Sequence, residues 1–539
     1  MKGLKTRILL TVVLLVTLVN CAKKGSITGG EEDVTPPKFI KASPPNFSTN
    51  FKAKEIKIYF DEYIKLKEPQ KQILISPPMD PSPIITPLGT ASKYIKIKFT
   101  DTLLENTTYS INFGESVVDN NEENPNPFFK YVFSTGNQLD SLKLKGFISD
   151  AVSKETERFI AVMLYEVDST YTDSLVYNEV PRYVTSTLDS VDFSLENLKS
   201  GTYKLIALKD KSSNFTYQPK QDKIGFYNEL ITIPTDTNKV HEVKLFKEIL
   251  DFEAKKPKQV SKYHLQFGYD GLGDSMKIKM LSDAPEGFEA RILKDTKKDT
   301  LHYWYKPFFE ADSLIFEITN SKNYSDTLVA RYKDQKPDSL VLNTLKSGTL
   351  KLEEDFIIES NTPLVKINDT LITLFDKDST AVAFNTSIDR IKNQAILKFK
   401  KTEENNYSLM LLPEALTDFY ENVNDTLIYN PQTTKYSEYG KMFLTLVNVA
   451  NYPVIIQLTD DKGVVLVEKS VTSTKETVFS ELEPRTYFLR VVDDRNENGI
   501  WDTGNFLKGL QPEGVSHFPK GIEVRANWEI KQSFTLGDL

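Results

Sequence analysis

The sequence has few of the residues that build metal centres and disulfide frameworks. Its 539 residues include one cysteine and four histidines. A single cysteine excludes an internal disulfide and any zinc site made mainly of cysteine. The histidines lie far apart in the sequence, and none forms a metal-binding HExxH pair: His241, His264, His302 and His517. We therefore expect no catalytic or metal-binding histidine.

Signals of other activities are also missing. The net charge of −8 gives no basic footprint, so we expect no nucleic-acid partner. No GxSxG elbow and no cysteine nucleophile are present. The glycine-rich run at 268–275 lacks the Lys-Ser/Thr pair of a phosphate loop and is read as a β-turn. Acidic pairs such as Asp61-Glu62 are typical of turns and solvated faces. The sequence therefore indicates a protein that is not an enzyme and requires no cofactor.

The sequence is rich in aromatic residues and in short runs in which apolar and polar residues alternate. Tyrosine (25) and phenylalanine (32) are abundant. Apolar and polar residues alternate at 55–60, 94–99 and 142–145. A period of two, broken at intervals by turn residues, predicts antiparallel β-sandwiches. Only 412–421 favours a short helix. The expected fold class is all-β, a linear array of about five antiparallel sandwich modules.

The N-terminus is typical of an exported protein. Basic residues within 1–7 precede an apolar run at 8–19, which is too short for a membrane span and predicts a signal peptide. The run ends in Leu-Val-Asn-Cys, which resembles the lipobox of bacterial lipoproteins and implies lipidation of Cys21. An ordinary signal peptide with an incidental cysteine is the alternative. The polar, glycine-rich stretch that follows predicts a flexible tether. Two or more acyl chains would anchor the protein stably.

Two parts of the chain occur twice. The tighter repeat aligns 193–210 with 479–494 after deletion of two residues. The looser repeat pairs three segments of the first module with three later ones: 58–63 with 373–378, 106–113 with 404–411, and 117–125 with 415–423. Repeats on this scale predict duplicated modules.

These segments also resemble known families. The runs "IKIYFDEYIKL", "ENTTYSINF" and "VVDNNEENP" resemble the bacterial Ig-like domain of S-layer proteins and Bacteroidota lipoproteins. The runs "LKSGTYKLIALKD" and "EPRTYFLRVVDDRNENGIWDTG" resemble transthyretin-like or carboxypeptidase-regulatory-like sandwiches. The resemblance implies a modular, non-catalytic, extracytoplasmic protein and does not imply a ligand.

The domain boundaries follow from these observations. We expect a signal peptide, a lipidated tether, an Ig-like domain, a transthyretin-like sandwich, a β-rich module, a degenerate Ig-like module and a second transthyretin-like sandwich. Their ranges are, in order, 1–20, 21–35, 36–137, 138–249, 250–345, 346–436 and 437–539.

The last module contains a loop that reads as the start of a calcium site. Oxygen-bearing side chains alternate at Asp494, Asn496 and Asn498, with Asp502 further on and Gly499 at the sharp turn. The backbone carbonyl of Ile500 adds a further oxygen. The duplicated loop keeps Asp210 but has Phe215 in place of the glycine and Gln218 in place of the last acid. The run is therefore either a structural Ca²⁺ site or only a strand-end turn.

The densest aromatic run, at 301–309, is the candidate binding surface. Exposed rings on a strand provide stacking platforms for sugars or hot spots for a protein partner. Alternation would place His302, Trp304 and Lys306 on one face and Tyr303 and Tyr305 on the other. The alternative is a strand whose rings pack in a core.

The resulting functional hypothesis is an outer-membrane lipoprotein, for which the cell surface is favoured over the periplasmic face as the location. It would serve as a non-enzymatic scaffold or accessory subunit of a membrane assembly for protein assembly, export or uptake. Its expected partners are the outer membrane, through the lipid, and a membrane protein. The alternative is a cell-surface glycan-binding or adhesion protein.

Overall fold

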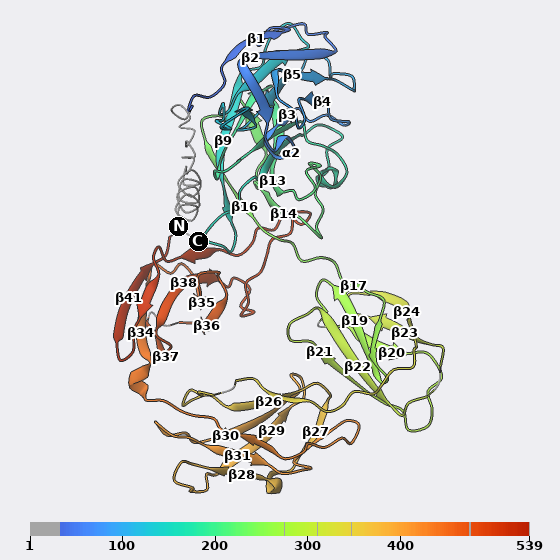
Figure 1. The fold of residues 1–539 in the computed structure, drawn as a ribbon, viewed down its shortest axis with the longest axis vertical. Helices are drawn as coiled ribbons and strands as arrows, with labels where there is room; N and C mark the ends of the chain where they lie inside the picture. Colours follow the sequence, from blue (N-terminus) through green and yellow to red (C-terminus); the bar gives the residue numbers. More distant parts are fainter. Residues whose placement is uncertain (1–32, 274, 310, 347, 474–475, 538–539) are drawn as a thin grey trace, which may run out of the picture. The chain divides into compact units, whose positions relative to one another are not determined.

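The computed structural model describes residues 33–537 except 274, 310, 347 and 474–475. The signal peptide, Cys21 and most of the tether lie outside the described residues. Strands make up nearly all of the regular structure, with one short α-helix, α2 (Pro69–Gln72), among the described elements (Figure 1). The predicted all-β class is confirmed. The described residues form two compact units, one of residues up to Lys143 with Glu196–Lys199, and the other of Leu144–Leu195 with the residues from Ser200 onwards.

The first unit contains the 39–134 sandwich. One sheet has the strand order β1-β2-β5-β4 with β7 on β2, and the other has the order β3-β6-β8. Alternating residues of these strands, such as Ile56, Ile58 and Phe60, are buried between the sheets. The strands are β1 (Phe39–Ser43), β2 (Glu55–Leu66), β3 (Leu74–Ser76), β4 (Ile84–Thr86), β5 (Ser92–Lys98), β6 (Thr108–Asn112), β7 (Val117–Asp119) and β8 (Lys130–Ser134).

The 142–245 sandwich pairs a three-stranded sheet, β12-β9-β16, with a sheet of order β11-β10-β13-β14 that also carries β15 on β13. Strand β16 is parallel to β9, whereas β10 and β13 pair antiparallel with each other and with β11, β14 and β15. The strands are β9 (Leu142–Asp150), β10 (Ala161–Glu166), β11 (Tyr183–Ser186), β12 (Asp192–Leu198), β13 (Gly201–Lys209), β14 (Lys223–Phe226), β15 (Ile231–Ile233) and β16 (Val240–Leu245).

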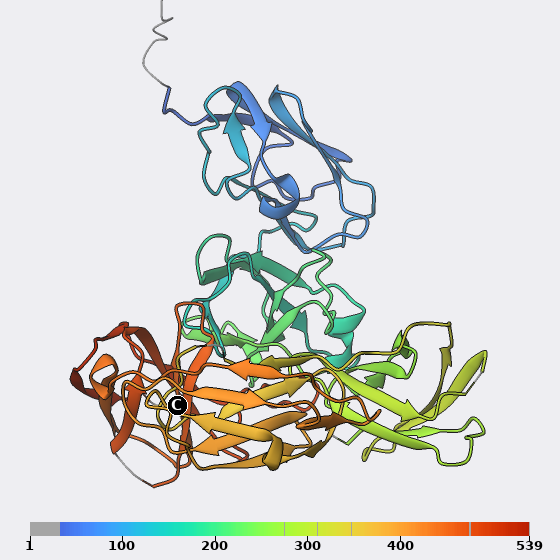
Figure 2. The same ribbon diagram turned by 60° about the horizontal axis from the view of Figure 1, so that its bottom comes forward.

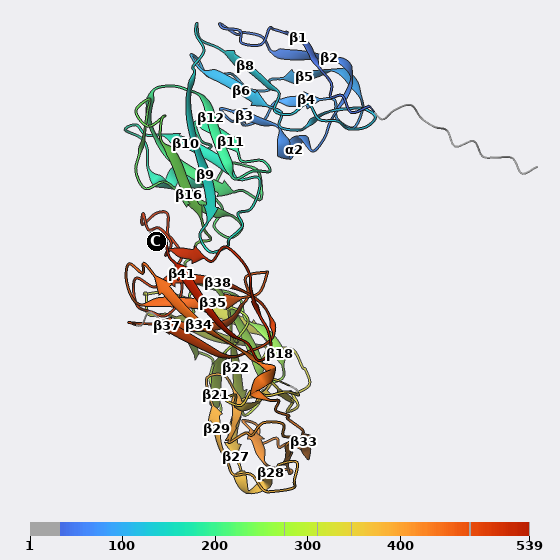
Figure 3. The same cartoon turned by 90° about the vertical axis from the view of Figure 1, so that its left-hand side faces the viewer.

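The 440–535 sandwich, drawn in orange and red in Figure 3, has the same topology as the 142–245 sandwich, strand for strand. Its sheets are β37-β34-β41, with β41 parallel to β34, and β36-β35-β38-β39 with β40 on β38. The register agrees as well, because Leu205 lies opposite Leu164 and the aligned Leu489 lies opposite Leu458. The predicted duplication of 193–210 and 479–494 is confirmed. The strands are β34 (Gly440–Val447), β35 (Val454–Thr459), β36 (Val465–Val471), β37 (Glu476–Leu482), β38 (Arg485–Asp493), β39 (Val515–His517), β40 (Ile522–Val524) and β41 (Glu529–Thr535).

The 253–331 sandwich, drawn in green to yellow-green in Figure 2, has a hydrophobic core of its own. Its sheets have the orders β17-β19-β22-β21, with β18 on β19, and β20-β23-β24. The strands are β17 (Glu253–Ala254), β18 (Lys258–Ser261), β19 (His264–Asp270), β20 (Lys277–Met280), β21 (Glu289–Lys294), β22 (Thr300–Lys306), β23 (Ser313–Thr319) and β24 (Ser325–Arg331).

The 342–429 sandwich repeats the strand order of the 39–134 sandwich. Its sheets are β25-β26-β30-β29 and β28-β31-β33, and β32 pairs with β27 as β7 pairs with the end of β2. The strands are β25 (Leu342–Thr344), β26 (Phe356–Ser360), β27 (Leu364–Ile367), β28 (Ile372–Phe375), β29 (Phe384–Asp389), β30 (Gln394–Phe399), β31 (Ser408–Leu411), β32 (Leu416–Asp418) and β33 (Leu427–Tyr429).

This topology corrects one part of the looser repeat. The pairing of 58–63 with 373–378 is wrong, because the first segment lies in β2 and the second in β28, which occupies the position of β3. The other two pairings are confirmed. Asp119 and Asp418, at the ends of β7 and β32, are both buried, and each accepts backbone N–H groups of the turn that follows.

The helix expected at 412–421 is also wrong. Leu416–Asp418 forms strand β32, and the next residues form the turn around Asp418. Pairing of β32 with β27 satisfies its backbone, so tertiary context overrides a weak local preference for helix.

Candidate functional site

The loop after β38 contains the five predicted calcium ligands. Asp494 is 2% exposed, and its carboxylate accepts two backbone N–H groups of the loop. Oδ1 accepts from Asn498 at 3.0 Å, and Oδ2 accepts from Gly499 at 2.9 Å. Gly499 has a φ of 78°, which a side chain disfavours. The buried carboxylate therefore folds the chain back on itself.

Three further side chains of the set converge beside this turn. The amide nitrogens of Asn496 and Asn498 donate to Asp502 Oδ2 at 2.5 and 2.7 Å. Asn498 Oδ1 accepts the backbone N–H of Ile500 at 2.9 Å, and the side chain of Ile500 is exposed. Carboxylate and amide oxygens suit a hard cation such as Ca²⁺. Its binding would require both amides to turn their oxygens towards the loop centre.

A carboxylate that the motif did not reveal braces this loop. Glu513 Oε1 accepts the N–H of Arg495 at 2.8 Å, and Oε2 accepts the N–H of Asp502 at 2.9 Å. Burial raises the pKa of Glu513, and the charges of Asp502 and Asp494 add to the effect. Glu513 lies 11 residues beyond Asp502, outside any spacing that a calcium motif specifies. Within the described residues, no three His, Cys, Asp or Glu side chains are grouped to hold a metal.

The duplicated loop after β13 makes the same bonds with other residues. Asp210 Oδ2 accepts the N–H of Phe215 at 2.7 Å, the bond that Asp494 makes to Gly499. Buried Asp222 accepts the N–H groups of Lys211 and Gln218 at 3.0 and 2.9 Å, the bonds that Glu513 makes in the other copy. Two carboxylates thus brace both loops, whether or not the remaining cation ligands are present.

The loop of the 440–535 sandwich continues into a segment that contacts the 142–245 sandwich. Phe506 is 1% exposed and lies 5.4 Å from the ring of Phe226. Its N–H donates to Glu248 Oε1 at 2.6 Å, and Tyr217 donates its hydroxyl to the other oxygen of Glu248 at 2.8 Å. The segment therefore places the Phe506 ring among buried groups of the 142–245 sandwich and forms a hydrogen bond there.

Polar contacts surround that inserted ring. Thr503 donates its hydroxyl to the carbonyl of Lys247 at 2.7 Å, and the Gln511 amide donates to the carbonyl of Phe226 at 2.8 Å. Gly504 lies so close to Phe246 that an added Cβ would approach its ring to 2.6 Å. The duplicated sandwiches are thus joined through the long loop of one of them.

The aromatic run of β22 is not an exposed platform. Tyr303, Trp304 and Tyr305 are 3%, 3% and 1% exposed, so the expectation of exposed rings is wrong. The predicted alternation holds, because Tyr303 contacts Tyr305 while Trp304 stacks with His302. Both faces of the strand are covered. Tyr303 and Tyr305 pack in the sandwich core, and Trp304 on the other face stacks with the rings of His264 and His302.

The acids expected in turns are used in turns and surface ion pairs. Asp61 Oδ1 accepts the N–H of Lys38 at 2.7 Å. Glu123 pairs with Lys67 at 2.7 Å on the surface of the 39–134 sandwich. Such exposed pairs contribute little to stability. These acids have structural partners, and the charges of Asp61, Asp119 and Glu122 lie close enough to Glu62 to add to the effect of burial in raising its pKa.

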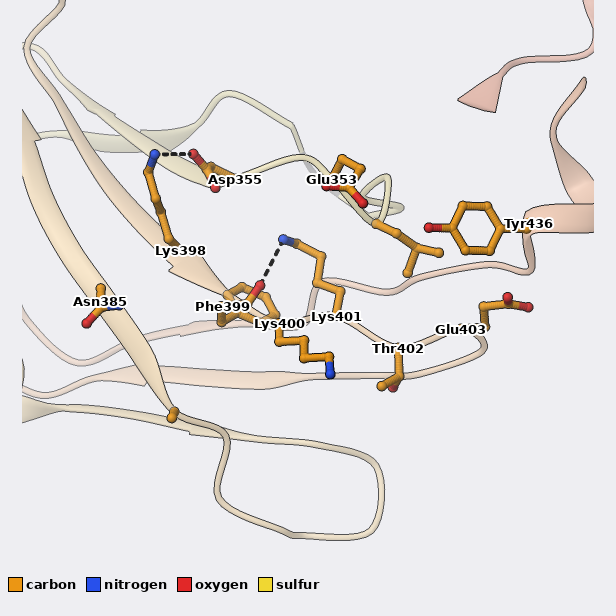
Figure 4. Close-up of a pocket in the computed structure, with 12 residues that line it drawn as sticks. Glu353, Asp355, Asn385, Lys398, Phe399, Lys400, Lys401, Thr402, Glu403 and Tyr436 are labelled. Carbon is orange, nitrogen blue, oxygen red and sulfur yellow. Dashed lines mark hydrogen bonds and ion pairs between the residues drawn. The ribbon is translucent and has the colours of Figure 1, made fainter. Parts of the chain in front are cut away.

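A cavity of about 730 Å³ lies beside β29 and β30 (Figure 4). Three lysines and three acids line it: Lys398, Lys400, Lys401, Glu353, Asp355 and Glu403. Lys398 pairs with Asp355 at 3.3 Å, and Lys401 donates to the carbonyl of Phe399 at 3.3 Å. Burial lowers the pKa of Lys401. The three positive and three negative side chains balance, so the lining favours neither an anionic nor a cationic ligand.

Among the described residues, no helix has the length and hydrophobicity of a membrane span. No curated protein sequence is significantly similar to the chain. Residues 33–135 match the family of bacterial Ig-like domains. This match supports the resemblance inferred for the first module.

Three solved structures that match the chain share 10–11% sequence identity with it. The surface layer protein SbsC, domains 1–6, is 11% identical with a TM-score of 0.15, over 87% of this chain and 67% of that one. A Bacteroides ovatus mixed-linkage glucan utilization protein, SGBP-B, is 10% identical with a TM-score of 0.19, over 70% and 93%. The insect immune protein hemolin is 10% identical with a TM-score of 0.17, over 73% and 100%. At these scores no function follows from the likeness, and the identified relationship is that of residues 33–135 to the bacterial Ig-like domain.

Proposed function

We propose that the protein is a non-enzymatic lipoprotein of the outer membrane, displayed at the cell surface, that acts as a scaffold or accessory subunit of a membrane assembly. The assembly would serve protein assembly, export or uptake. The lipobox-like sequence at Cys21 supports the anchor, and the Ig-like match at 33–135 supports an extracytoplasmic location.

The observation that carries the proposal is the joint between the duplicated sandwiches. Burial of Phe506 and its bond to Glu248 fix one sandwich against the other. A scaffold needs such fixed geometry to present separate surfaces to partners, whereas this joint brings no reactive groups together. Interfaces between domains of one chain are movable unless contacts of this kind secure them.

Strand β36 offers a surface for a protein partner. It is the end strand of its sheet, and its first two residues are exposed, as is the residue that precedes it: Val465 (39%), Leu466 (38%) and Val464 (57%). The corresponding strand β11 in the duplicated sandwich buries both its apolar residues, Tyr183 and Val184. An apolar edge strand is a template for an added strand. The proposed occupant is an extended segment of the membrane-protein partner.

The test is a pull-down of the lipidated full chain from detergent-solubilised membranes. Leu466→Lys should remove a stoichiometric membrane partner, because a charge on the edge opposes strand addition. Ile391→Lys is the control, since Ile391 is a single exposed residue (79%) in the turn between β29 and β30. Recovery of no stoichiometric partner by the unmodified protein would contradict the proposal.

The lipid anchor is tested separately. Cys21→Ser should move the protein from the membrane to the soluble fraction, and intact mass should show the loss of the acyl chains. An unchanged mass would favour an ordinary signal peptide. Retention of the partner by the soluble variant would separate partner binding from anchoring.

The Ca²⁺ proposal concerns the stability of the module and not an activity. We propose that Asp494, Asn496, Asn498 and Asp502, with the carbonyl of Ile500, hold one Ca²⁺ that stiffens the loop. Two carboxylates and three neutral oxygens are five ligands, one to three fewer than the six to eight that Ca²⁺ takes, and water supplies the remainder. Such an ion would reinforce the segment that carries Phe506.

A further inference from the structure

Four polar side chains form a hydrogen-bonded row in the 253–331 sandwich. His264 Nε2 lies 2.8 Å from His302 Nδ1. The outer nitrogen of His302 lies 3.1 Å from Asp295 Oδ2, and that of His264 lies 3.3 Å from Asp338 Oδ2. Side-chain exposures range from 7% at His264 to 23% at Asp338. The row therefore reads Asp-His-His-Asp and is largely shielded from water.

Sheet pairing brings the two histidines together across 38 residues of sequence. His264 lies on β19, and His302 lies on the neighbouring strand β22. Trp304 stacks on both rings, with centroid distances of 4.5 Å and 5.2 Å and interplanar angles of 13° and 14°. Asp295 follows β21, whereas Asp338 belongs to the 332–341 segment that leads to the next sandwich.

The number of protons in this row follows from its geometry. Each outer nitrogen faces a carboxylate, which accepts a hydrogen bond and donates none when ionised. Each outer nitrogen therefore carries a proton, and the two inner nitrogens share one. Three protons on two rings are one more than a neutral pair holds. Two protons would leave either a lone pair facing a carboxylate or two lone pairs facing each other between the rings, and four would place two N–H groups head to head.

The surrounding groups support this count. Burial opposes ionisation of Asp295, but the N–H groups of Lys297 and Lys298 and the bond to His302 hold its pKa below the usual range. Burial likewise opposes ionisation of Asp338, but the His264 ring nitrogen, 3.3 Å from its carboxylate, keeps the pKa of Asp338 below its usual range. The indole face of Trp304 favours a positive charge beneath it.

Other charged groups limit the pair to a single charge. Burial lowers the pKa of His302, and the charges of His264 and Lys298 lower it further, although Asp295 opposes them. From the 342–429 sandwich, Tyr420 faces Asp338, and burial and that carboxylate raise the pKa of its hydroxyl. A second positive charge on the pair is therefore disfavoured.

We propose that His264 and His302 share one positive charge between Asp295 and Asp338, and that this charged pair is a pH-dependent latch that holds the 332–341 segment against β19. The segment has further bonds to the same sandwich, since Lys262 donates its N–H to the carbonyl of Lys336 at 3.2 Å. The contact through Asp338 is the one that belongs to the charged row.

The latch is complete near neutral pH and weakens on both sides. On the acid side, His302 has a folded-state pKa below 6.5, so the unfolded segment binds more protons and stability falls as the pH drops below about 6.5. On the alkaline side the shared proton is lost, the two inner nitrogens then present lone pairs to each other at 2.8 Å, and the row no longer holds His264 in place beside Asp338. The change also affects the contact between the 253–331 and 342–429 sandwiches, because Tyr420 donates its hydroxyl to the carbonyl of Tyr263 beside β19.

The proton count is measured on the full chain by nitrogen NMR with labelled histidine, which gives only four residues to assign. At pH 7 the expected result is one coupled pair that carries three ring protons and a nitrogen–nitrogen hydrogen bond. Two neutral rings at pH 7 would overturn the proposal, and so would two independent titrations.

The latch is measured by hydrogen exchange of the 332–341 amides, corrected for intrinsic exchange rates. Protection should be greatest near pH 7 and should fall at least tenfold in Asp338→Asn. Asp334→Asn is the matched control, because Asp334 lies in the same segment and its side chain is 93% exposed. His302→Gln should abolish the pH dependence. Equal protection in Asp338→Asn and the unmodified protein would overturn the latch.

Discussion

The loops after β13 and β38 show how one backbone arrangement is kept by different residues. In both loops a strand-end aspartate accepts the N–H five residues ahead, and a second buried carboxylate bridges two further N–H groups. Left-handed φ angles recur at aligned positions, 55° and 58° at Ser213 and Phe215, and 62° and 78° at Glu497 and Gly499. The turn is therefore the shared feature, and the calcium-like residues are an addition to one copy.

The two copies differ in the segment that comes after the turn. The 494–513 loop gains Asp502 and the segment that buries Phe506, while the 210–222 loop has Gln218 at the aligned position. A duplicated turn has thus become the attachment point of one copy to the other. Changes made in one loop at a time, with the other loop as the reference, can separate the shared turn from the added attachment.

Removing the inserted ring should have the largest effect. Phe506→Ala should weaken the joint by about 3–5 kcal/mol, the usual cost of deleting a buried aromatic ring. Hydrogen exchange at 502–511 measures the loss. Leu507→Ala is the control, since Leu507 is 56% exposed. An equal effect of both substitutions would show that Phe506 does not secure the joint.

Calcium should separate the two loops. At a Ca²⁺ concentration 100 times its dissociation constant, the 440–535 sandwich should gain about 2.7 kcal/mol. The 142–245 sandwich should gain nothing directly, because it lacks the carboxylate at Gln218. Amide hydrogen exchange of the strands of each sandwich, measured once in the presence of Ca²⁺ and once in the presence of a chelator, gives the difference. No change in the 494–513 loop would refute the Ca²⁺ site.

Deleting the strand-end carboxylate should affect both loops alike without Ca²⁺. Asp494→Ala and Asp210→Ala each leave backbone N–H groups without an acceptor, which costs about 1–3 kcal/mol. The asparagine variants keep one acceptor oxygen and should lose less. Local exchange is again the measurement. A loss only at Asp494 would mean that the shared turn is not the common basis of stability.

The smallest effect should come from the left-handed residue. Gly499→Ala should cost about 1 kcal/mol, because φ is 78° and an added Cβ meets nothing within 4 Å. Gly463→Ala, in the turn between β35 and β36, has the same open surroundings at φ 80° and should cost as much. A much larger cost at Gly499 in Ca²⁺ than in chelator would place the residue in a metal-dependent turn.

The sequence was most informative where a pattern is local. Alternation predicted the strands, and the match of 193–210 to 479–494 identified a duplication that the registers of β13 and β38 confirm. The pairing of 58–63 with 373–378 failed because Phe60-Asp61 lies in the middle of β2, whereas Phe375 is the last residue of β28, so the shared residue pair carries no register. Aromatic density at 301–309 indicated a strand but not which face is covered, since burial depends on the elements that pack against it.

The sequence by itself determined the strand content, the duplicated turns and the oxygen-bearing residues of the last loop. These result from side-chain period, turn chemistry and spacing along the chain. Only the tertiary structure decided that His264 meets His302, that Glu513 braces its loop and that Phe506 enters another sandwich. Each of those contacts joins residues that are distant in sequence, and their proximity is set by sheet pairing and packing, which leave no local signal.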